Sequence, residues 1–464
     1  MEIKKLSRRQ FLALSAATAT GTVLAACAPA PEETPAEEVP AEATPAEEVP
    51  AEATAPPPTE AVTLHFWHWD NYLQEPYNKE GEIWAEENDL NVTVSFEPIP
   101  WEEYSQKMLA ALAGGTPPDL CGGAGEHQVS LGANGAFEPL MPFIERDNYD
   151  LSDFHPRTLK QNTWMGTLVS LPYGTDCHYW YYSLEAFQEA GLKTPTEYWR
   201  EGKWTWDVAM DLAEKLTKGS GADKQFGVAD PGVQSYYRFV PYIWQNGGDL
   251  FDDAYTKALI NEDPSVEAFQ WAFNMRPFAP GPQDEQTATY RSGRVMQWVN
   301  WDIYYVLDRE NVPFDYRAAP TPASPTTGER VFIGDACSFG IGKGSEHQDL
   351  AWEFLKFTLT PESLTRLFVI TCQPPSRMSM FEDDTIWQML DVPEPEVSWQ
   401  IEVERWKNFR NLPKMDNWLE MWKAEQEEIS LAWVDEQPLE LALDKVADRW
   451  NELLVVAEID PDAN

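Results

Sequence analysis

The chain has 464 residues, enough for two or three domains, and its 77 acidic against 34 basic residues give a formal net charge of −43. This acidic excess argues against nucleic acid and anionic lipid surfaces as partners, because both attract basic patches. The charge otherwise bears on solubility rather than on the fold.

The first 26 residues have the composition of an export signal. Arg8 and Arg9 precede a short apolar run that is diluted by polar residues, whereas a stable membrane span needs about 20 predominantly apolar residues. Residues 7–12 (SRRQFL) resemble a twin-arginine export motif. Residues 24–27 (LAAC) resemble a bacterial lipobox, which implies that Cys27 becomes the lipid-modified first residue of the mature chain. We therefore expect an exported protein, lipid-anchored to the outer face of the cell membrane; the alternative is an unprocessed hydrophobic N-terminus.

Residues 27–60 do not have the composition of a folded core. The string PAEEVPAEAT at 35–44 is repeated at 45–54, and residues 28–60 include no aromatic and no basic residue. Such a segment buries too little apolar surface to offset the entropy of ordering it. Its prolines and like charges favour an extended chain. We expect a disordered tether between the lipid and the folded body.

The folded body, residues 61–464, opens with strand and helix patterns in alternation. Residues 62–69 (VTLHFWHW) and 91–96 are rich in β-branched and aromatic residues, which is typical of strands. Residues 104–112 have apolar side chains at helical spacing. Strands that alternate with helices predict a parallel α/β architecture.

The remaining elements are expected at intervals down the chain. Ser183 is predicted to cap a helix that ends at Gly191, and Thr205 is predicted to cap the helix that follows it. The pattern predicts strands at 168–174 and 178–182, a helix at 350–359, and two amphipathic helices within 417–454.

Four cysteines lie in the body: Cys121, Cys177, Cys337 and Cys372. They are too far apart for a C-x-x-C metal or redox motif. An exported protein can form disulfides, so one disulfide and four buried thiols stay open as alternatives. The six histidines are scattered, and His65 and His68 should point to opposite faces of their strand. We expect no metal site, with calcium on surface carboxylates left open.

Six strings occur along the body in a particular order. They are MLAALAGGTPPD at 108–119, LPY at 171–173 followed by WYY at 180–182, WTWD at 204–207, QNGGD at 245–249, RSGRVM at 291–296 with Trp301, and AWEFLK at 351–356 followed by Pro374 and Arg377. In these strings the chain resembles the extracellular solute-binding proteins of ABC importers, the carbohydrate-type family that includes maltose-binding protein.

The resemblance implies a two-lobed α/β fold of the type II periplasmic-binding-protein kind, with the ligand in a cleft between the lobes. Three interlobe crossings are expected near 173–177, 332–338 and 373–380. The first lobe would comprise 61–173 plus 338–375, and the second 177–332 plus 380–464. Hinge closure would trap the ligand, and the closed form would dock on a membrane permease. We expect a monomer.

The 21 tryptophans favour a sugar or oligosaccharide as ligand, because sugars present C–H faces to aromatic rings and hydroxyl groups to carboxylates and amides. Trp67, Trp69 and Asp70 come at the end of the first strand, where open α/β sheets bind ligands. The resemblance implies an aromatic sugar platform around Trp301, the leading candidate; Asn300 stands where the family commonly has glycine, which leaves the register open by one residue. The candidate ligand-binding residues are Trp67, Trp69, Asp70, Trp101, Asp176, Trp244, Trp298, Asn300, Trp301, Asp335 and Arg377.

The alternatives to a sugar-binding protein are an exported enzyme and a receptor for a non-sugar solute. An exported glycosidase would need two carboxylates roughly 5–10 Å apart, but 77 acidic residues make such pairs uninformative. The chain has no G-x-S-x-G, H-E-x-x-H or phosphate-loop motif, so we expect neither an enzyme nor a cofactor. Within the binding class, the alternative ligand is a glycerol phosphate or another polar solute, for which arginines in the cleft would be expected.

Trp418 and Trp422 lie one helical turn apart, and core packing is expected for at least one of them.

Overall fold

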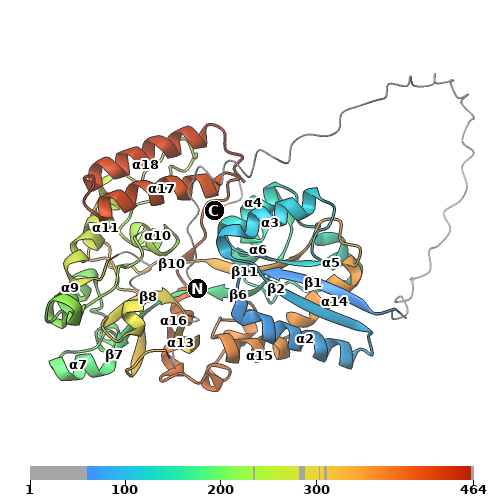
Figure 1. Cartoon of the computed structure of the whole chain (residues 1–464), viewed down its shortest axis with the longest axis horizontal. Coiled ribbons are helices and arrows are strands. Elements are labelled where there is room, and N and C mark those ends of the chain that lie inside the picture. The colour runs from blue at the N-terminus through green and yellow to red at the C-terminus, as the bar shows by residue number, and fades with distance from the viewer. Residues whose placement is uncertain (1–59, 234–235, 282–287, 303, 308–310, 461–464) are drawn as a thin grey trace, which may run out of the picture. The chain divides into compact units, whose positions relative to one another are not determined.

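The computed structural model describes residues 60–233, 236–281, 288–302, 304–307 and 311–460 (Figure 1). The chain divides into residues 1–56 and 57–464, and every described residue belongs to the second of these units. Arg8, Arg9, Cys27 and nearly all of the expected tether lie outside the described residues.

A five-stranded sheet, here called the first sheet, has the strand order β2-β1-β3-β11-β6. β1 (Val62–His68) pairs in parallel with β2 (Val92–Pro98) and β3 (Leu120–Gly123). β11 (Asp335–Ile341) runs antiparallel to β3 and to β6 (Leu171–Asp176). The parallel prediction is therefore confirmed for β1–β3 and wrong for β11. The reason is that β11 enters the sheet at the edge where β6 leaves it, with Asp335 opposite Asp176.

A three-stranded antiparallel sheet, the second sheet, has the order β8-β7-β9. It consists of β7 (His178–Ser183), β8 (Gln297–Trp301) and β9 (Tyr316–Pro320). Successive side chains of a strand point to opposite faces, and β7 supplies two cores in this way: Trp180 and Tyr182 pack in one, Tyr179 and Tyr181 in the other. Two short pairs complete the strands: β4 (Thr163–Trp164) with β5 (Thr167–Leu168), and β10 (Phe332–Ile333) with β12 (Phe409–Arg410).

Helices cover both sheets. The α-helices are α2 (Gln74–Glu87), α3 (Trp101–Ala113), α4 (Gly125–Ala133), α5 (Met141–Asp147), α6 (Pro156–Gln161), α7 (Leu184–Ala190), α8 (Pro195–Arg200), α9 (Trp206–Leu216), α10 (Tyr236–Gln245), α11 (Asp263–Asn274), α13 (Tyr304–Leu307), α14 (Gln348–Thr358), α15 (Pro361–Thr371), α16 (Pro395–Arg405), α17 (Trp418–Trp433) and α18 (Leu439–Leu454). Short 3-10 turns are η1 (Asn71–Leu73), η2 (Gly221–Asp223), η3 (Arg276–Phe278), η4 (Met378–Phe381) and η5 (Trp387–Met389).

The predicted caps have different outcomes. The Ser183 hydroxyl accepts the backbone N–H of Ala186 at the start of α7, and the helix ends at Gly191 in the left-handed region with φ 62°, so this prediction is confirmed. Thr205 occupies the N-cap position of α9 but makes no side-chain cap hydrogen bond, so that prediction is wrong. The first N–H of α9, on Trp206, donates instead to the carbonyl of Ala323.

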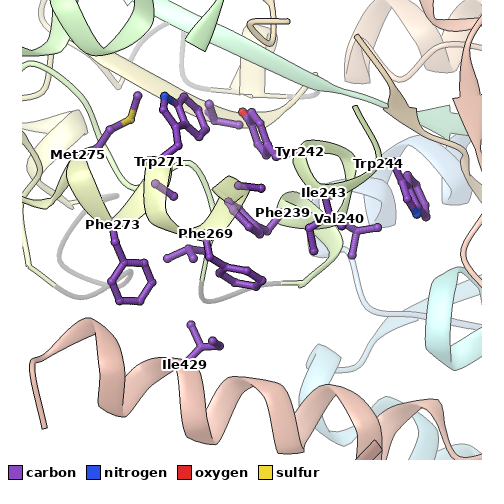
Figure 2. Packing of buried hydrophobic residues seen from close by; sticks show 14 of the residues in the cluster. Phe239, Val240, Tyr242, Ile243, Trp244, Phe269, Trp271, Phe273, Met275 and Ile429 are labelled. Atoms are coloured by element: carbon purple, nitrogen blue, oxygen red, sulfur yellow. The ribbon is translucent and has the colours of Figure 1, made fainter. Parts of the chain in front are cut away.

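Aromatic side chains build the cores on which the sheets rest. Phe66 of β1 contacts Tyr77, Phe96 and Phe339 edge to face, with ring centroids 4.6–5.4 Å apart. The second large core lies around α10 and α11, where Phe239, Phe269 and Trp271 pack together and Ile429 of α17 faces them (Figure 2). Trp418 is buried in this core, as expected for at least one of Trp418 and Trp422.

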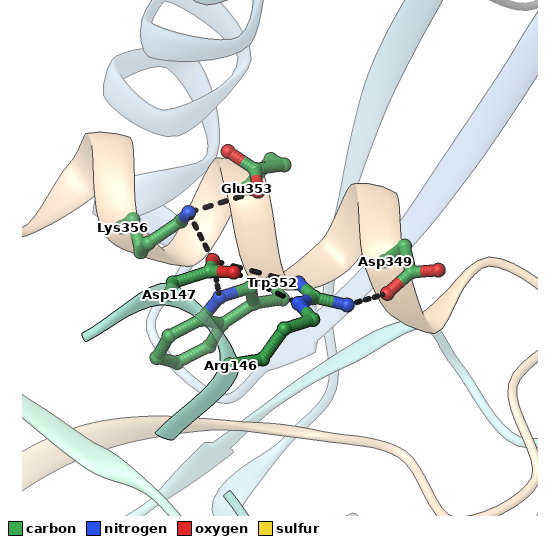
Figure 3. A network of polar contacts seen from close by, with 6 residues as sticks. All are labelled: Arg146, Asp147, Asp349, Trp352, Glu353 and Lys356. Carbon is green, nitrogen blue, oxygen red and sulfur yellow. Dashed lines mark hydrogen bonds and ion pairs between the residues drawn. The ribbon is translucent and has the colours of Figure 1, made fainter. Parts of the chain in front are cut away.

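Polar contacts fix α5 against α14 (Figure 3). Asp147 accepts hydrogen bonds from Trp352 Nε1 at 2.7 Å and from Lys356 Nζ at 2.5 Å, and Arg146 pairs with Asp349 at 2.6 Å. Arg146 and Lys356 together hold the pKa of Asp147 well below its usual range. These contacts anchor a helix of the first sheet's layer, away from the carboxyl ends of its strands.

At two places a single residue separates a strand of the first sheet from a strand outside it. β6 of the first sheet and β7 of the second are separated by Cys177 alone, and β10 and β11 by Gly334 alone. A Cβ atom on Gly334 would lie 2.1 Å from the Phe409 ring, so this passage requires glycine. The bounds of the two lobes given above stay a prediction.

A buried ion pair supports the β6–β7 passage. Arg405 Nε donates to Glu402 Oε2 at 2.5 Å, and Arg405 Nη2 donates to the Thr175 hydroxyl of β6 at 2.6 Å. The side chains of Glu402 and Arg405 are both fully buried. Arg405 thereby attaches α16 to Thr175 of β6, two residues before Cys177.

The four cysteines of the body, Cys121, Cys177, Cys337 and Cys372, are free and buried. The alternative of four buried thiols is therefore the one that the structure supports. Burial raises the pKa of each of the thiols of Cys121, Cys177 and Cys372.

Candidate functional site

Three of the predicted tryptophans come together beyond the end of β1. The Trp69 ring meets the Trp101 ring edge to face at 4.9 Å, and it stacks on His68 at 3.9 Å. Trp101 also contacts the His127 ring of α4 at 4.0 Å. Trp67 packs against the same small core and has Lys107 Nζ 4.6 Å from its ring. An aromatic wall, here defined as Trp67, Trp69, Trp101 and His127, thus forms at the carboxyl edge of the first sheet.

Asp70 and Asp176 lie near each other beside this wall. Tyr72 Oη donates to Asp70 at 3.0 Å, while Asp176 accepts Gln373 Nε2 at 2.6 Å and Cys337 Sγ at 3.0 Å. Burial and the nearby charge of Asp176 raise the pKa of Asp70 to about 7, and burial also raises the pKa of Asp176. The Asp70 carboxyl can therefore be protonated near neutral pH and can donate as well as accept a hydrogen bond.

His68 joins the carboxyl pair to the sheet as a neutral side chain. Burial lowers its pKa to about 3, so the 3.7 Å approach of its ring to Asp70 is not an ion pair near neutral pH. Its Nδ1 accepts the backbone N–H of Asp70 at 3.1 Å, which leaves Nε2 to donate to Tyr173 Oη at 3.2 Å. The ring thereby fixes the backbone from which Asp70 projects.

Trp301 stands on the second sheet, directly across from His178 in the β7–β8 register. The two rings are 4.0 Å apart, with Trp301 partly exposed and His178 buried. His178 Nε2 has no hydrogen-bond partner. Burial and the positive charge of Arg238 lower the pKa of His178 well below its usual range, so the ring is neutral and can bond a ligand hydroxyl.

The neighbours of Trp301 in β8 are buried. Asn300 Oδ1 accepts the backbone N–H of Trp301 at 2.9 Å, which shapes the end of the strand. Trp298 is 2% exposed and packs on Tyr290 at 4.3 Å and Tyr304 at 5.4 Å within a core. Of the three candidates in this block, Trp301 is the one with exposed ring surface.

The two groups of candidates are connected by a very short stretch of chain. Asp176, next to Asp70, ends β6, and His178, against Trp301, begins β7 two residues later. Two residues of extended chain span about 7 Å. The structure thus brings Trp67, Trp69, Asp70, Trp101, Asp176 and Trp301 to one passage between the sheets.

Two further candidates, Trp244 and Arg377, lie at other places, whereas Asp335 stands beside Asp176. Trp244 is buried, donates to Asp249 at 3.1 Å and lies under Arg410, which pairs with Asp249 at 2.7 Å beside a cavity of about 50 Å³. Arg377 donates to the Leu359 carbonyl at 2.6 Å and to Tyr149 Oη at 3.0 Å, and it pairs with Asp153 at 3.4 Å. Asp335 opens β11 opposite Asp176, and its side chain is outside the described part of the structure.

His127 and His178 belong to this site but carry no signal in the sequence. His127 Nε2 is buried without a hydrogen-bond partner, and so is Nε1 of the predicted Trp67. Buried polar atoms are normally bonded, so these two atoms of the aromatic wall are candidates for ligand contact. His178 belongs to the site because strand pairing places it opposite Trp301, and the sequence alone does not give that register.

Two larger cavities lie elsewhere. One of about 350 Å³ lies between α2 and α15, lined among others by Ile83 and Ile370, and its charged pair Glu80–Arg366 is already joined at 2.7 Å. One of about 550 Å³ lies at the ends of α11 and α17, beside Phe273 and Trp433. Neither of these cavities combines aromatic rings with unpaired buried polar atoms, as the group around the β6–β7 passage does.

Within the described ranges, no helix has the length and apolar character needed to cross a bilayer. The same residues include no group of three or more histidine, cysteine or acidic side chains placed to hold a metal ion.

A family model described as bacterial extracellular solute-binding protein matches residues 75–394. The chain belongs to this family. The fold likeness is equally broad: an ABC substrate-binding protein, Lmo0181 from Listeria monocytogenes, solved with cycloalternan, aligns with a TM-score of 0.76 at 18% identity, over 85% of this chain and 100% of that one. The expected two-lobed type II fold is thereby confirmed, and membership of this family implies export.

Two curated relatives differ in the ligand that their names give. The diacetylchitobiose binding protein DasA of Streptomyces coelicolor is 24% identical over 284 residues, 58% of this chain and 62% of that protein. The sn-glycerol-3-phosphate-binding periplasmic protein UgpB of Salmonella typhimurium is 22% identical over 433 residues, 85% of this chain and 92% of that protein. Both relatives are solute-binding proteins.

Proposed function

We propose that this solute-binding protein captures a sugar or oligosaccharide between its lobes and delivers it to the permease of an ABC importer. One observation carries the proposal: the aromatic wall with its carboxyl pair and the Trp301–His178 pair flank the same passage from β6 to β7 at Cys177. Aromatic faces pack on the C–H faces of sugars, and carboxyl and imidazole groups bond the hydroxyls. Binding rather than catalysis is the role, in keeping with the relatives.

The candidate ligand residues are Trp67, Trp69, Asp70, Trp101, Asp176 and Trp301, with His127 and His178 added from the structure. Trp298 and Asn300 support Trp301 from within β8, and Arg377 attaches η4 to the first lobe. Hinge motion at 173–177, 332–338 and 373–380 would close the lobes on the ligand.

The mature protein would be a monomer held at the outer membrane face by lipid on Cys27 after twin-arginine export. The tether of residues 27–60 would keep the receptor near its permease, which raises its effective concentration there.

A glycerol phosphate ligand is the second candidate, favoured by the extent of the UgpB match. A phosphate would need unpaired cations or helix N-termini. Arg410 and Arg377 lie away from the candidate site and are engaged by Asp249 and Asp153. The charge of Arg238 acts on His178, but the aromatic groups of the site outnumber this cation, which favours the neutral sugar.

A thermal-shift panel of oligosaccharides and glycerol phosphates tests the proposal, because a ligand that binds only the native state raises the melting temperature. We expect at least one sugar to raise it and the phosphates to leave it unchanged. A shift with phosphates alone would replace the sugar assignment by the second candidate.

A further inference from the structure

Arg238, in the first turn of α10, lies beside the Trp301–His178 pair of the candidate site. An electrostatic interaction joins its guanidinium to His178, whose ring is 4.0 Å from that of Trp301. A second one joins it to Tyr304, which begins α13 just after β8. These neighbours place the arginine at the second sheet's side of the β6–β7 passage.

The backbone before α10 supports this placement. The N–H of Ala229 donates to a carbonyl of β8 at 2.8 Å, so the chain that leads into α10 runs beside that strand. A Cβ atom on Gly232, where φ is 100°, would lie 2.3 Å from Cβ of Arg238. Only glycine leaves room for the arginine stem there. Val233 packs in the core that Trp301 borders. The stem of Arg238 is therefore held against backbone close to the end of β8.

The guanidinium of Arg238 has no hydrogen-bond or ion-pair partner among the described residues. The residue is partly exposed, and none of its nitrogen atoms is fully buried. Asp230 acts on Arg238 through its charge, but its carboxylate accepts the backbone N–H groups of Gly232 and Val233. Arg238 therefore presents open N–H donors beside the candidate site.

The ligand group that meets Arg238 must be an acceptor, because a guanidinium has donors only. A neutral acceptor suits the surroundings better than a second anion. Asp230 already acts on Arg238, and Asp176, with Asp70 nearby, lies two residues before His178. A carboxylate or phosphate on the ligand would be repelled by these like charges.

Amide carbonyls are neutral acceptors that arginines of this chain use elsewhere. Arg276 Nη1 donates to the carbonyl of Trp433 at 3.0 Å, and Arg377 Nε donates to that of Leu359 at 2.6 Å. A sugar carries the same group in an N-acetyl substituent. The amide N–H of that substituent can in turn donate to Nε2 of His178, which is buried without a partner. One acetamido group thus satisfies both open groups of the site.

We propose that Arg238 selects a sugar unit with an N-acetyl group: Arg238 donates to the acetamido carbonyl, the acetamido N–H donates to His178, and the sugar ring packs on Trp301. The inference rests on the proposed function and narrows its ligand class. Hydrogen bonds from a charged donor are stronger than those between neutral groups, so the preference for the acetamido group should depend on Arg238 above all.

Calorimetry with two matched disaccharides tests this inference on the whole protein. Diacetylchitobiose and cellobiose share one linkage and differ only in carrying acetamido or hydroxyl groups beside it. We expect the wild-type protein to bind diacetylchitobiose about tenfold more tightly, as one charge-assisted hydrogen bond would provide. Arg238→Met should abolish that preference and leave the affinity for cellobiose nearly unchanged. Arg200→Met, which removes an exposed arginine at the end of α8, is the control and should keep the preference.

The possible outcomes are distinguishable. If the wild type binds the two sugars equally or binds neither, the inference is wrong, and the thermal-shift panel decides separately whether sugar capture stands. If Arg238→Met keeps the preference, Arg238 does not select the ligand. Should Arg238→Met fail to fold, Arg238→Lys takes its place, because lysine keeps the charge and an aliphatic stem but lacks the forked guanidinium. Arg238→Lys should lose most of the preference, and a full preference would overturn the inference.

Discussion

Single residues at the passage between the sheets have properties that their sequence positions do not reveal. Asp70 could be placed at a strand end from the sequence, but its burial and the nearby charge of Asp176, more than 100 positions away, which together raise the Asp70 pKa, could not. Trp301 could be named as an aromatic platform, whereas its contact with His178 depends on strand register. The local sequence pattern thus predicts which residues stand at the end of a strand, whereas the pairing of strands decides which of their side chains come into contact.

The Asp70 carboxyl predicts a dependence of stability on pH. Its pKa is raised in the folded protein from the usual 3.8 to about 7, so the native state holds more protons than the unfolded state between those values. The free energy of unfolding should therefore fall as pH rises through this range. In urea titrations from pH 4 to 7, the free energy of unfolding of the Asp70→Asn protein should fall less steeply with pH than that of the wild type. Parallel curves for the two proteins would contradict this account of Asp70.

The Trp301 ring predicts a loss of affinity on truncation. Trp301→Ala should weaken sugar binding by ~1–3 kcal/mol, because the stacking surface is removed. Calorimetry with the sugar found in the panel measures it, with circular dichroism to verify the fold. Trp399→Ala on α16, another partly buried tryptophan, is the control and should bind as wild type. Unchanged affinity of a folded Trp301→Ala protein would remove Trp301 from the site.

At the scale of elements, some strands and helices could be predicted from periodicity, including β1, β2, β7, α14 and the final pair α17 and α18. The direction of β11 could not, because it depends on where the chain re-enters the first sheet rather than on the local pattern of Asp335–Ile341. The cap at Thr205 could not be read from the sequence either, because standing at the N-cap position of α9 does not by itself direct the hydroxyl to an N–H of the first turn.

The buried pair Glu402–Arg405 next to the β6–β7 passage should contribute to the free energy of unfolding only while both charges are present. Arg405→Met should cost ~3–5 kcal/mol in unfolding free energy, because Glu402 is left buried without its cation. Glu402→Leu combined with Arg405→Met should recover much of the loss. Denaturant titration of the three proteins provides the comparison, and a double variant as unstable as the single one would show that the charge is not the cause.

At the scale of the whole molecule, the order of six strings was enough to predict the two-lobed fold, which the family match and the fold likeness confirm. The grouping of the candidate ligand residues was predictable only in part. Trp67, Trp69, Trp101, Asp70, Asp176 and Trp301 gather at one passage, whereas Trp298 and Asn300 turn into the core and Trp244 lies under Arg410. A tryptophan suits a core as well as a cleft, and composition does not distinguish the two environments.

The central claim is that the lobes close on a sugar, and the solute that the protein retains when purified gently from its own cells tests it most directly. Mass spectrometry of the material released on denaturation should detect a saccharide at about one equivalent per chain, and the Trp301→Ala protein should release much less. Release of a glycerol phosphate or another non-sugar solute at that stoichiometry, with no saccharide, would contradict the claim.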